Sequence, residues 1–177
     1  MSTKRTDHEL LLGEWACLGL LCAEPSHGFA IAAQLRPDAE IGRIWSVSRP
    51  LTYRSLDQLG ERGLIRPIGS EPGHAGPNRT ILAPTRSGRA RLLRWLGVPV
   101  EHLRDLRSEL LLKLALADRC GIAVDGMLQL QRTRLDAQAA ALSAAAFDVD
   151  GAVVDTVALW RYEASRAGLR FLDQLER

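Results

Sequence analysis

The chain has 177 residues, of which 46% are hydrophobic, 25% charged and 5% aromatic, with a formal net charge of +2. This length suits one or two small domains with a buried core, and the composition excludes disordered and collagen-like proteins. No apolar run reaches the roughly 18 to 20 residues that span a bilayer, and no secretory signal is apparent. Three cysteines, Cys17, Cys22 and Cys120, form an odd set. This set favours reduced thiols in a cytoplasmic protein.

Charge is distributed unevenly along the chain. Residues 1–99 hold 13 basic and 9 acidic side chains, whereas residues 100–177 hold 10 and 12. Within residues 43–94, ten arginines stand against three acidic side chains, so this segment carries +7. Arginine suits bidentate contact with phosphate or guanine, and such asymmetry indicates a nucleic-acid or membrane partner. A solvated basic face is an equally good interpretation of the charge alone.

The first elements are predicted to be two short helices. Residues 7–21 place apolar side chains close to helical spacing, and Pro25 ends that element. Ser26 is a candidate N-cap for a second helix over residues 27–35. Residues 41–47 then form a short connector.

A third helix is well marked and a hairpin follows it. Ser48 can cap the helix, Pro50 falls in its first turn, and Gly63 supplies its C-terminal stop. Residues 64–68 and 79–83 are predicted to be two strands around a turn rich in glycine and proline. The apolar residues expected to point inward from the third helix are Leu51, Leu56, Leu59 and the following Leu64.

Thr85 is a candidate cap for a fourth helix, whose apolar positions include Leu92, Trp95 and Leu96. Three helices, a hairpin and a further helix within about a hundred residues follow the order of a winged helix-turn-helix. The predicted fold is therefore mainly α with a small β-hairpin wing. Residues 1–98 are expected to form the DNA-binding domain, and residues 99–177 a helical dimerisation domain.

The C-terminal half lacks strand signals and contains three predicted helices. Residues 100–117 are strongly apolar, and residues 125–146 place Leu128, Leu135 and Leu142 seven residues apart. The last segment carries a sustained heptad-like stripe that a lone helix cannot bury. We expect the C-terminal half to form an antiparallel helical hairpin that serves dimerisation, and an intramolecular bundle is the alternative. The stripe consists of Val153, Val157, Trp160, Ala164, Ala167, Phe171 and Leu175.

Short segments of the first hundred residues match a known family in type and order. They are Leu18-Gly19-Leu20-Leu21, Pro25-Ser26-His27-Gly28-Phe29, Trp45-Ser46-Val47-Ser48, Leu51-Thr52-Tyr53-Arg54-Ser55-Leu56, Leu59-Gly60-Glu61-Arg62-Gly63-Leu64-Ile65, Gly76-Pro77-Asn78-Arg79 and Thr85-Arg86-Ser87-Gly88-Arg89. On these residues the chain closely resembles the PadR family of bacterial transcriptional regulators, and its tail resembles the longer, virulence-activator-like branch. The resemblance implies a dimeric winged-helix DNA-binding protein, usually a repressor, whose C-terminal helices dimerise.

Candidate DNA-binding residues lie at the start of the third helix and in the wing. A recognition helix contacts base edges with its N-terminal residues, and Arg pairs bidentately with guanine. Arg49 is therefore the candidate for base contact. Arg79 is expected to reach the DNA backbone or the minor groove, unless it is a solvated loop arginine. Candidates for phosphate contact are Ser48, Thr52, Tyr53 and Arg54, although the Tyr53 ring could instead pack beneath the helix.

Other candidate chemistry favours structural roles. His27 is expected to pack and cap where helices cross, with a phosphate contact or a pH-sensitive group as the alternative. Cys17, Cys22 and His27 lack a Cys-x-x-Cys pair and a fourth ligand, so no metal or other cofactor is expected. Cys120 could sense oxidants. A cavity lined by Trp15, Trp95, Phe171 or Trp160 could bind a small aromatic or amphipathic effector, and apolar packing at a dimer interface explains these rings equally well.

Enzymatic motifs are missing from the sequence, since it contains no nucleotide-binding glycine loop, nucleophile elbow or zinc-protease motif. The favoured hypothesis is a dimeric regulator bound to a pseudo-palindromic operator in double-stranded DNA. The alternative is a winged-helix adaptor that makes only protein contacts and shows no salt-dependent affinity for DNA.

Overall fold

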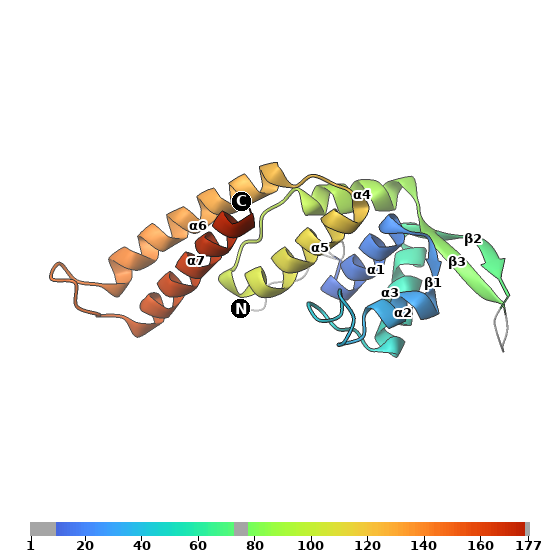
Figure 1. The fold of residues 1–177 in the computed structure, drawn as a ribbon, viewed down its shortest axis with the longest axis horizontal. Coiled ribbons are helices and arrows are strands. Elements are labelled where there is room, and N and C mark those ends of the chain that lie inside the picture. The colour runs from blue at the N-terminus through green and yellow to red at the C-terminus, as the bar shows by residue number, and fades with distance from the viewer. Residues whose placement is uncertain (1–9, 73–77, 176–177) are drawn as a thin grey trace. The chain divides into compact units, whose positions relative to one another are not determined.

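The computed structural model describes residues 10–72 and 78–175, which fall into two compact units (Figure 1). The first unit is Met1–Trp95 with Leu111–Ala123, and the second is Leu96–Leu110 with Val124–Arg177. The predicted boundary after residue 98 therefore differs from the packing, because a later helix joins the first unit. No helix in the described part of the chain is long and apolar enough to cross a bilayer.

Within its described residues, the first unit contains five α-helices: α1 (Leu12–Ala23), α2 (Gly28–Gln34), α3 (Arg49–Glu61), α4 (Arg86–Leu96) and α5 (Leu111–Cys120). Helix α1 lies in the middle and packs against α3 and α5. Burial of its apolar side chains supplies the main driving force for folding. The fully buried side chains of this core include Leu18, Leu21, Ile31, Leu35, Leu59, Leu92 and Leu116.

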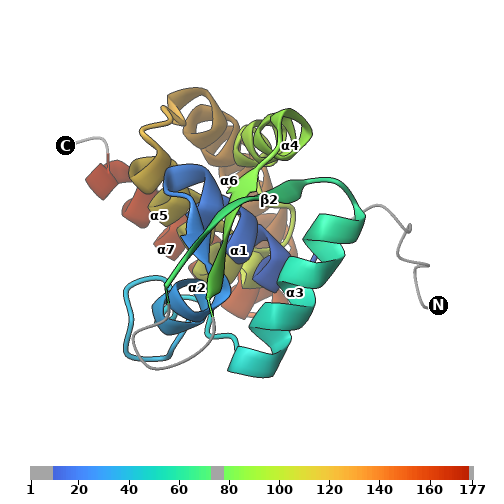
Figure 2. The same ribbon diagram turned by 90° about the vertical axis from the view of Figure 1, so that its right-hand side faces the viewer.

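A three-stranded antiparallel sheet completes the first unit, in the order β1-β3-β2. Strands β2 (Ile65–Glu71) and β3 (Arg79–Pro84) confirm the predicted hairpin, while its Gly76-Pro77 segment lies outside the described residues. Strand β1 (Ser26–His27), which pairs with β3, was not predicted from the sequence. Figure 2 shows the hairpin and α3 exposed on the same face of this unit.

The buried face of α3 differs from the predicted one. Thr52, Ser55, Leu56 and Leu59 are buried, at the i, i+3, i+4, i+7 spacing of one helix face. Leu51, predicted to point inward, is 53% exposed, because it lies outside that face. Gly63 follows the helix with a φ of +65°, which confirms the predicted glycine stop.

The helices around residue 100 also depart from expectation. Residues 100–117 do not form one helix: a 3₁₀ turn η1 (Leu103–Asp105) and a π-helical turn η2 (Leu106–Leu110) precede α5. Helix α5 packs against α1, and a Cβ on Gly19 would lie only 2.5 Å from the Leu116 side chain. This close contact explains why α5 belongs to the first unit in packing, although it was predicted to belong to the C-terminal domain.

The second unit is dominated by two long helices, α6 (Asp125–Ala146) and α7 (Thr156–Leu175), which pack side by side and antiparallel (Figure 1). The predicted helical hairpin is thus confirmed. The buried Gln131 amide accepts from the Val100 N–H and donates to the Val100 carbonyl, so its polar atoms are satisfied. The buried residues of the pair are Met127, Gln131, Leu135, Ala139, Ala146, Ala158, Ser165, Leu169 and Leu172.

Candidate nucleic-acid interface

The N-terminal end of α3 presents polar and basic side chains to solvent. Ser48 is the N-cap, and its hydroxyl makes no capping hydrogen bond to the helix. Arg49 and Arg54 are exposed, and Tyr53 is 39% exposed. A helix N-terminus carries partial positive charge and favours anions. Four of the five predicted α3 residues are therefore accessible to a phosphate or a base edge.

Thr52 is the exception and corrects the predicted set. Its side chain is fully buried, and its hydroxyl donates to the Ser48 carbonyl at 3.1 Å. A buried hydroxyl that is already bonded cannot reach a DNA phosphate without unfolding the first turn. Thr52 instead stabilises the first turn of α3.

Arg79 begins β3 and lies directly across the hairpin from Glu71. It is not a solvated loop arginine, because one guanidinium nitrogen lies 3.3 Å from Nε2 of His27. Strand β1 makes this contact, since it pairs His27 with Ile81, two residues along β3. The Arg79 side chain therefore lies beside the helical part of the first unit.

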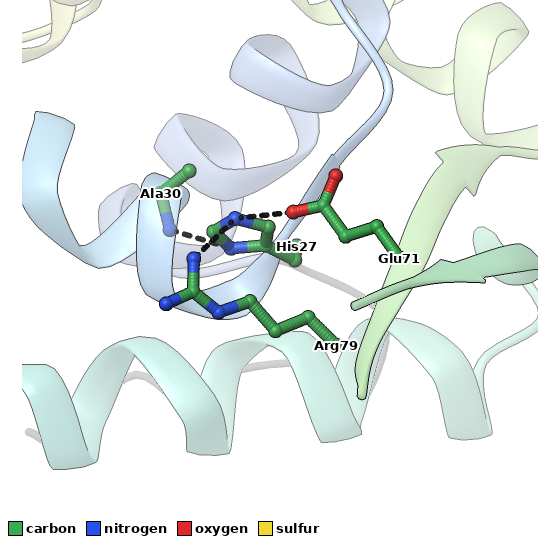
Figure 3. Close-up of polar contacts among 4 residues, drawn as sticks. All are labelled: His27, Ala30, Glu71 and Arg79. Carbon is green, nitrogen blue, oxygen red and sulfur yellow. Dashed lines mark hydrogen bonds and ion pairs between the residues drawn. The ribbon is translucent and has the colours of Figure 1, made fainter. Parts of the chain in front are cut away.

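His27 links α2 to the hairpin (Figure 3). Its Nδ1 accepts the Ala30 backbone N–H at 3.0 Å, which confirms the predicted capping role and leaves the proton of a neutral ring on Nε2. That N–H donates to the Glu71 carboxylate at 3.0 Å. Glu71, His27 and Arg79 thus form one polar cluster at the base of the wing.

Phe29 has no predicted role, although the two arginines predicted to bind DNA both lie over its ring. Its ring is 46% exposed, and the guanidinium carbons of Arg49 and Arg79 each lie 5.1 Å from its centroid. Both contacts fall within cation–π range. One signal was available, because Phe29 lies in the segment Pro25-Ser26-His27-Gly28-Phe29, which the sequence analysis had already singled out.

Tyr53 shows the packing that the sequence left open as an alternative, and part of its ring stays exposed. Its ring packs on Gly28, where an added Cβ would come within 2.8 Å of the ring, and the Arg49 guanidinium lies 5.9 Å from its centroid. The exposed remainder of the ring faces solvent. Gly28 therefore allows α2 and α3 to approach closely enough for Phe29, Tyr53 and Arg49 to form one cluster.

The environments of the cysteines and tryptophans in the first unit favour structural roles for these side chains. Burial raises the pKa of Cys17 to about 12 and that of Cys22 to about 11, and burial also raises the pKa of Cys120. Raised pKa values disfavour the reactive thiolate. Trp15 and Trp95 stack at 4.6 Å, so each is a packing partner for the other. Within the described residues no group of His, Cys, Asp or Glu could hold a metal ion.

Val153, the first residue of the predicted stripe, lies before α7 begins, in a bridge to Phe147. The other stripe residues lie largely on the helix face opposite the residues that α7 buries. Trp160 is 74% exposed and Val157 58%, while the residues that α7 buries are others on its opposite side. Val153, Phe171 and Leu175 are exposed as well, as is Ala167, and Ala164 is half-buried. An exposed apolar stripe of this length indicates an interaction surface.

These features define the class of the chain as a winged helix-turn-helix protein with a helical hairpin. No family model matches it. Over 96 residues it is 30% identical to the probable transcriptional regulator Rv1176c of Mycobacterium tuberculosis, in an alignment that covers 54% of this chain and 49% of that protein. The chain thus spans about half the length of this curated relative.

Two solved structures are also similar to the chain. PadR of Bacillus subtilis in complex with operator DNA is 18% identical with a TM-score of 0.46, covering 92% of this chain and 96% of that one. The virulence activator AphA of Vibrio cholerae is 22% identical with a TM-score of 0.42, covering 93% of this chain and 91% of that one.

Proposed function

We propose that this chain is a PadR-type transcriptional regulator, a cytoplasmic homodimer that binds double-stranded DNA through α3 and the wing. The observation that carries the proposal is the convergence of Arg49 from α3 and Arg79 from β3 on the exposed Phe29 ring. The name of the Mycobacterium tuberculosis relative, a probable transcriptional regulator, supports the same function.

In this proposal α3 enters the major groove with its N-terminal end. Arg49 pairs with a guanine edge, which specifies sequence, while Ser48, Tyr53 and Arg54 donate to phosphate oxygens, which fix position. Arg79 contacts the backbone or the adjacent minor groove. The Phe29 ring, 5.1 Å from the Arg79 guanidinium carbon, holds the Arg79 side chain against α2, so that less side-chain freedom is lost on binding.

The exposed apolar face of α7 supplies the dimer contact. Two copies that meet along this face bury Val157, Trp160 and Phe171, which are exposed in the single chain. A two-fold dimer places two recognition helices about one DNA turn apart, ~34 Å, and so binds a pseudo-palindromic operator. Repression relieved by a small-molecule effector is the regulatory mode we propose.

Salt dependence of DNA affinity tests this function. We expect the full chain to bind a labelled duplex, with affinity that falls steeply between about 50 and 200 mM salt because phosphate contacts release counterions. Fluorescence anisotropy titrations measure the slope. An adaptor that makes only protein contacts predicts no binding to duplex DNA at any of these salt concentrations, and that result would overturn the proposal.

A further inference from the structure

The polar cluster at the base of the wing joins one histidine to two side chains of opposite charge (Figure 3). Glu71 and Arg79 face each other across the hairpin, where β2 ends and β3 begins. Nε2 of His27 lies 3.0 Å from the Glu71 carboxylate and 3.3 Å from a guanidinium nitrogen of Arg79. The two charged groups therefore meet at a single ring nitrogen, on a side chain that is only 13% exposed.

The charged and titratable side chains that face His27 come from the elements packed around it. The ring centroids of His27 and Phe29 lie 6.2 Å apart, so the groups over Phe29 are also its neighbours. Among the described residues with contacts to these two rings or to each other, β2 supplies one acidic group, while β3 and α3 supply arginines and a tyrosine. They are Glu71, Arg79, Arg49 and Tyr53.

The hydrogen bonds define the neutral state of the His27 ring. Nδ1 accepts the Ala30 N–H at 3.0 Å, so its lone pair is occupied and the ring proton lies on Nε2. Because that N–H donates to Glu71, the Arg79 guanidinium approaches Nε2 as a second donor and not as its hydrogen-bond partner. In this state the Glu71 carboxylate offsets the charge of Arg79.

A second proton on the ring changes each of these contacts. It has to go to Nδ1, which then points a donor at the Ala30 N–H, so α2 loses its cap. The imidazolium repels Arg79 and forms a charge-assisted hydrogen bond with Glu71. Histidine is the side chain that changes charge between about pH 5 and 8. In the protonated state Glu71 is neutralised by His27, and Arg79 is left to an external anion.

A DNA phosphate at Arg79 favours the protonated ring, which sets the sign of the coupling. The phosphate neutralises Arg79 and so removes the repulsion that disfavours a charged His27. It also repels the Glu71 carboxylate, which the imidazolium neutralises. The loss of the Ala30 cap accompanies protonation with and without DNA, so it cancels from the difference between the two states.

We propose that His27 is a positioning residue that takes up a proton when the wing binds a DNA phosphate. The inference rests on the proposed function, because the phosphate contact of Arg79 belongs to that function. The neutral ring keeps Arg79 compensated by Glu71, and the charged ring releases Arg79 to the phosphate. By linkage, a binding step that takes up a proton is strengthened by acid, so acidification strengthens the grip of the wing on DNA.

The state of the ring is tested on the full chain labelled with ¹⁵N and without DNA. At about pH 8, long-range ¹H–¹⁵N correlation should show His27 protonated at Nε2 and not at Nδ1. The Ala30 amide resonance should then move together with the ring nitrogens as the pH falls to about 5.5. A proton on Nδ1 at about pH 8, or an Ala30 amide that does not follow the ring, would overturn the inference.

The coupling to DNA is measured by fluorescence anisotropy with a labelled random-sequence duplex. The affinity of the wild type should rise about tenfold between about pH 8 and about pH 5.5, as one proton is taken up per chain. His27→Gln removes the titrating ring and should lose most of this rise. His102→Gln is the matched control, because His102 is exposed and its side chain makes no capping hydrogen bond. Equal pH dependence in His27→Gln and in the wild type would overturn the inference.

Glu71→Gln gives a second test that leaves the cap of α2 in place. The amide oxygen still accepts the Nε2 N–H, but the negative charge beside Arg79 is gone. DNA affinity at about pH 8 should therefore rise about three- to tenfold, and the further rise on acidification should shrink. Asp118→Asn is the matched control, because it removes the same charge from an exposed position on α5 and should leave the affinity close to that of the wild type. Unchanged affinity in Glu71→Gln would overturn the inference.

The same titrations separate this inference from the proposed function. A chain that binds no duplex at any pH overturns the proposed function and the coupling with it. A chain that binds the duplex with equal affinity at about pH 8 and about pH 5.5 overturns the coupling alone.

Discussion

Helices α3 and α7 both expose a face to solvent, and the two faces have opposite chemistry. The exposed face of α3 carries Arg49, Tyr53 and Arg54, whereas that of α7 carries Val157, Trp160 and Phe171. Each helix buries its other face within its own unit. A basic face remains hydrated until a polyanion binds, while an apolar face gains free energy only against another apolar surface.

The comparison shows that the residues a helix buries within its own unit do not determine which partner its exposed face can bind. Helix α3 uses the small side chains of Thr52 and Ser55 on its inner face, which leaves its long side chains outside. Helix α7 uses Ala158 and Ser165 inside in the same way and leaves its largest ring, Trp160, outside. We therefore propose a polyanion as the partner of the exposed face of α3 and a second copy of the chain as the partner of the exposed face of α7.

The largest expected effect on assembly and DNA affinity comes from substitutions on the exposed face of α7. The double substitution Trp160→Glu with Phe171→Glu should convert a dimer to a monomer, because it places charges in the apolar contact. DNA affinity should then fall by about a hundredfold or more, since the second half-site contact is lost. Light scattering coupled to size exclusion measures the mass, and circular dichroism checks that the helices persist.

Arg166→Glu is the matched control for α7, because Arg166 is exposed, does not belong to the stripe, and changes the net charge by the same two units. It should remain a dimer. A dimeric double variant would contradict the assignment of this face.

On the α3 side, Arg49→Ala should weaken specific binding by ~1 to 3 kcal/mol and relax selection at one base position. The loss reflects a bidentate contact with one base rather than general charge. Mobility shifts with operator variants measure it. Equal losses on every sequence would indicate that Arg49 contacts only phosphate.

A smaller and more uniform effect is expected for the wing. Arg79→Ala should weaken binding to all sequences to a similar extent and reduce the salt slope by about one unit. Titrations at several salt concentrations measure the slope. An unchanged slope would remove Arg79 from the DNA-binding surface.

Phe29 should contribute to DNA affinity by positioning Arg49 and Arg79. Phe29→Leu keeps an apolar side chain but removes the ring, and a cation–π contact at an exposed site contributes ~0.5 to 1 kcal/mol. We expect DNA affinity to fall by about two- to fivefold and Phe29→Tyr to restore it. If the leucine and tyrosine variants bind DNA equally well, the ring does not position Arg49 and Arg79.

The smallest effect on DNA is expected at Thr52. Thr52→Val should lower the free energy of unfolding by ~0.5 to 1.5 kcal/mol, since it removes the bond to the Ser48 carbonyl, and leave DNA affinity unchanged. Thr133→Val is the control, because its hydroxyl makes the same type of bond to the Gln129 carbonyl on an exposed helix face. Lower DNA affinity at unchanged stability would restore Thr52 to the interface.

Periodicity and caps predicted most of the fold, because these signals are local. The Gly63 stop, the Thr85 cap, which accepts the Gly88 N–H at 3.1 Å, and the bounds of α6 follow from a few adjacent residues. The assignment of Leu51 to the core failed, because hydrophobicity was weighed residue by residue. The face containing Leu56 and Leu59 continues through Thr52 and Ser55.

Contacts between distant segments could not be predicted from one sequence. The position of α5 depends on the contact between Gly19 and Leu116, and the position of the Arg79 side chain depends on the short strand β1. Five of the candidate DNA-binding residues are accessible: Ser48, Arg49, Tyr53, Arg54 and Arg79. For the first four, the position at the start of a helix was enough to predict this, whereas Arg79 lies in the hairpin. Phe29 was missed, because its role appears only when α2, α3 and β3 come together.

Selection of bound duplexes from a random library with the full chain tests the central claim most directly. The account predicts an inverted repeat whose half-site centres lie about one DNA turn apart, with one guanine preference that disappears in Arg49→Ala. Recovery of unenriched sequences, or of a single half-site that Arg49→Ala selects equally well, would contradict it.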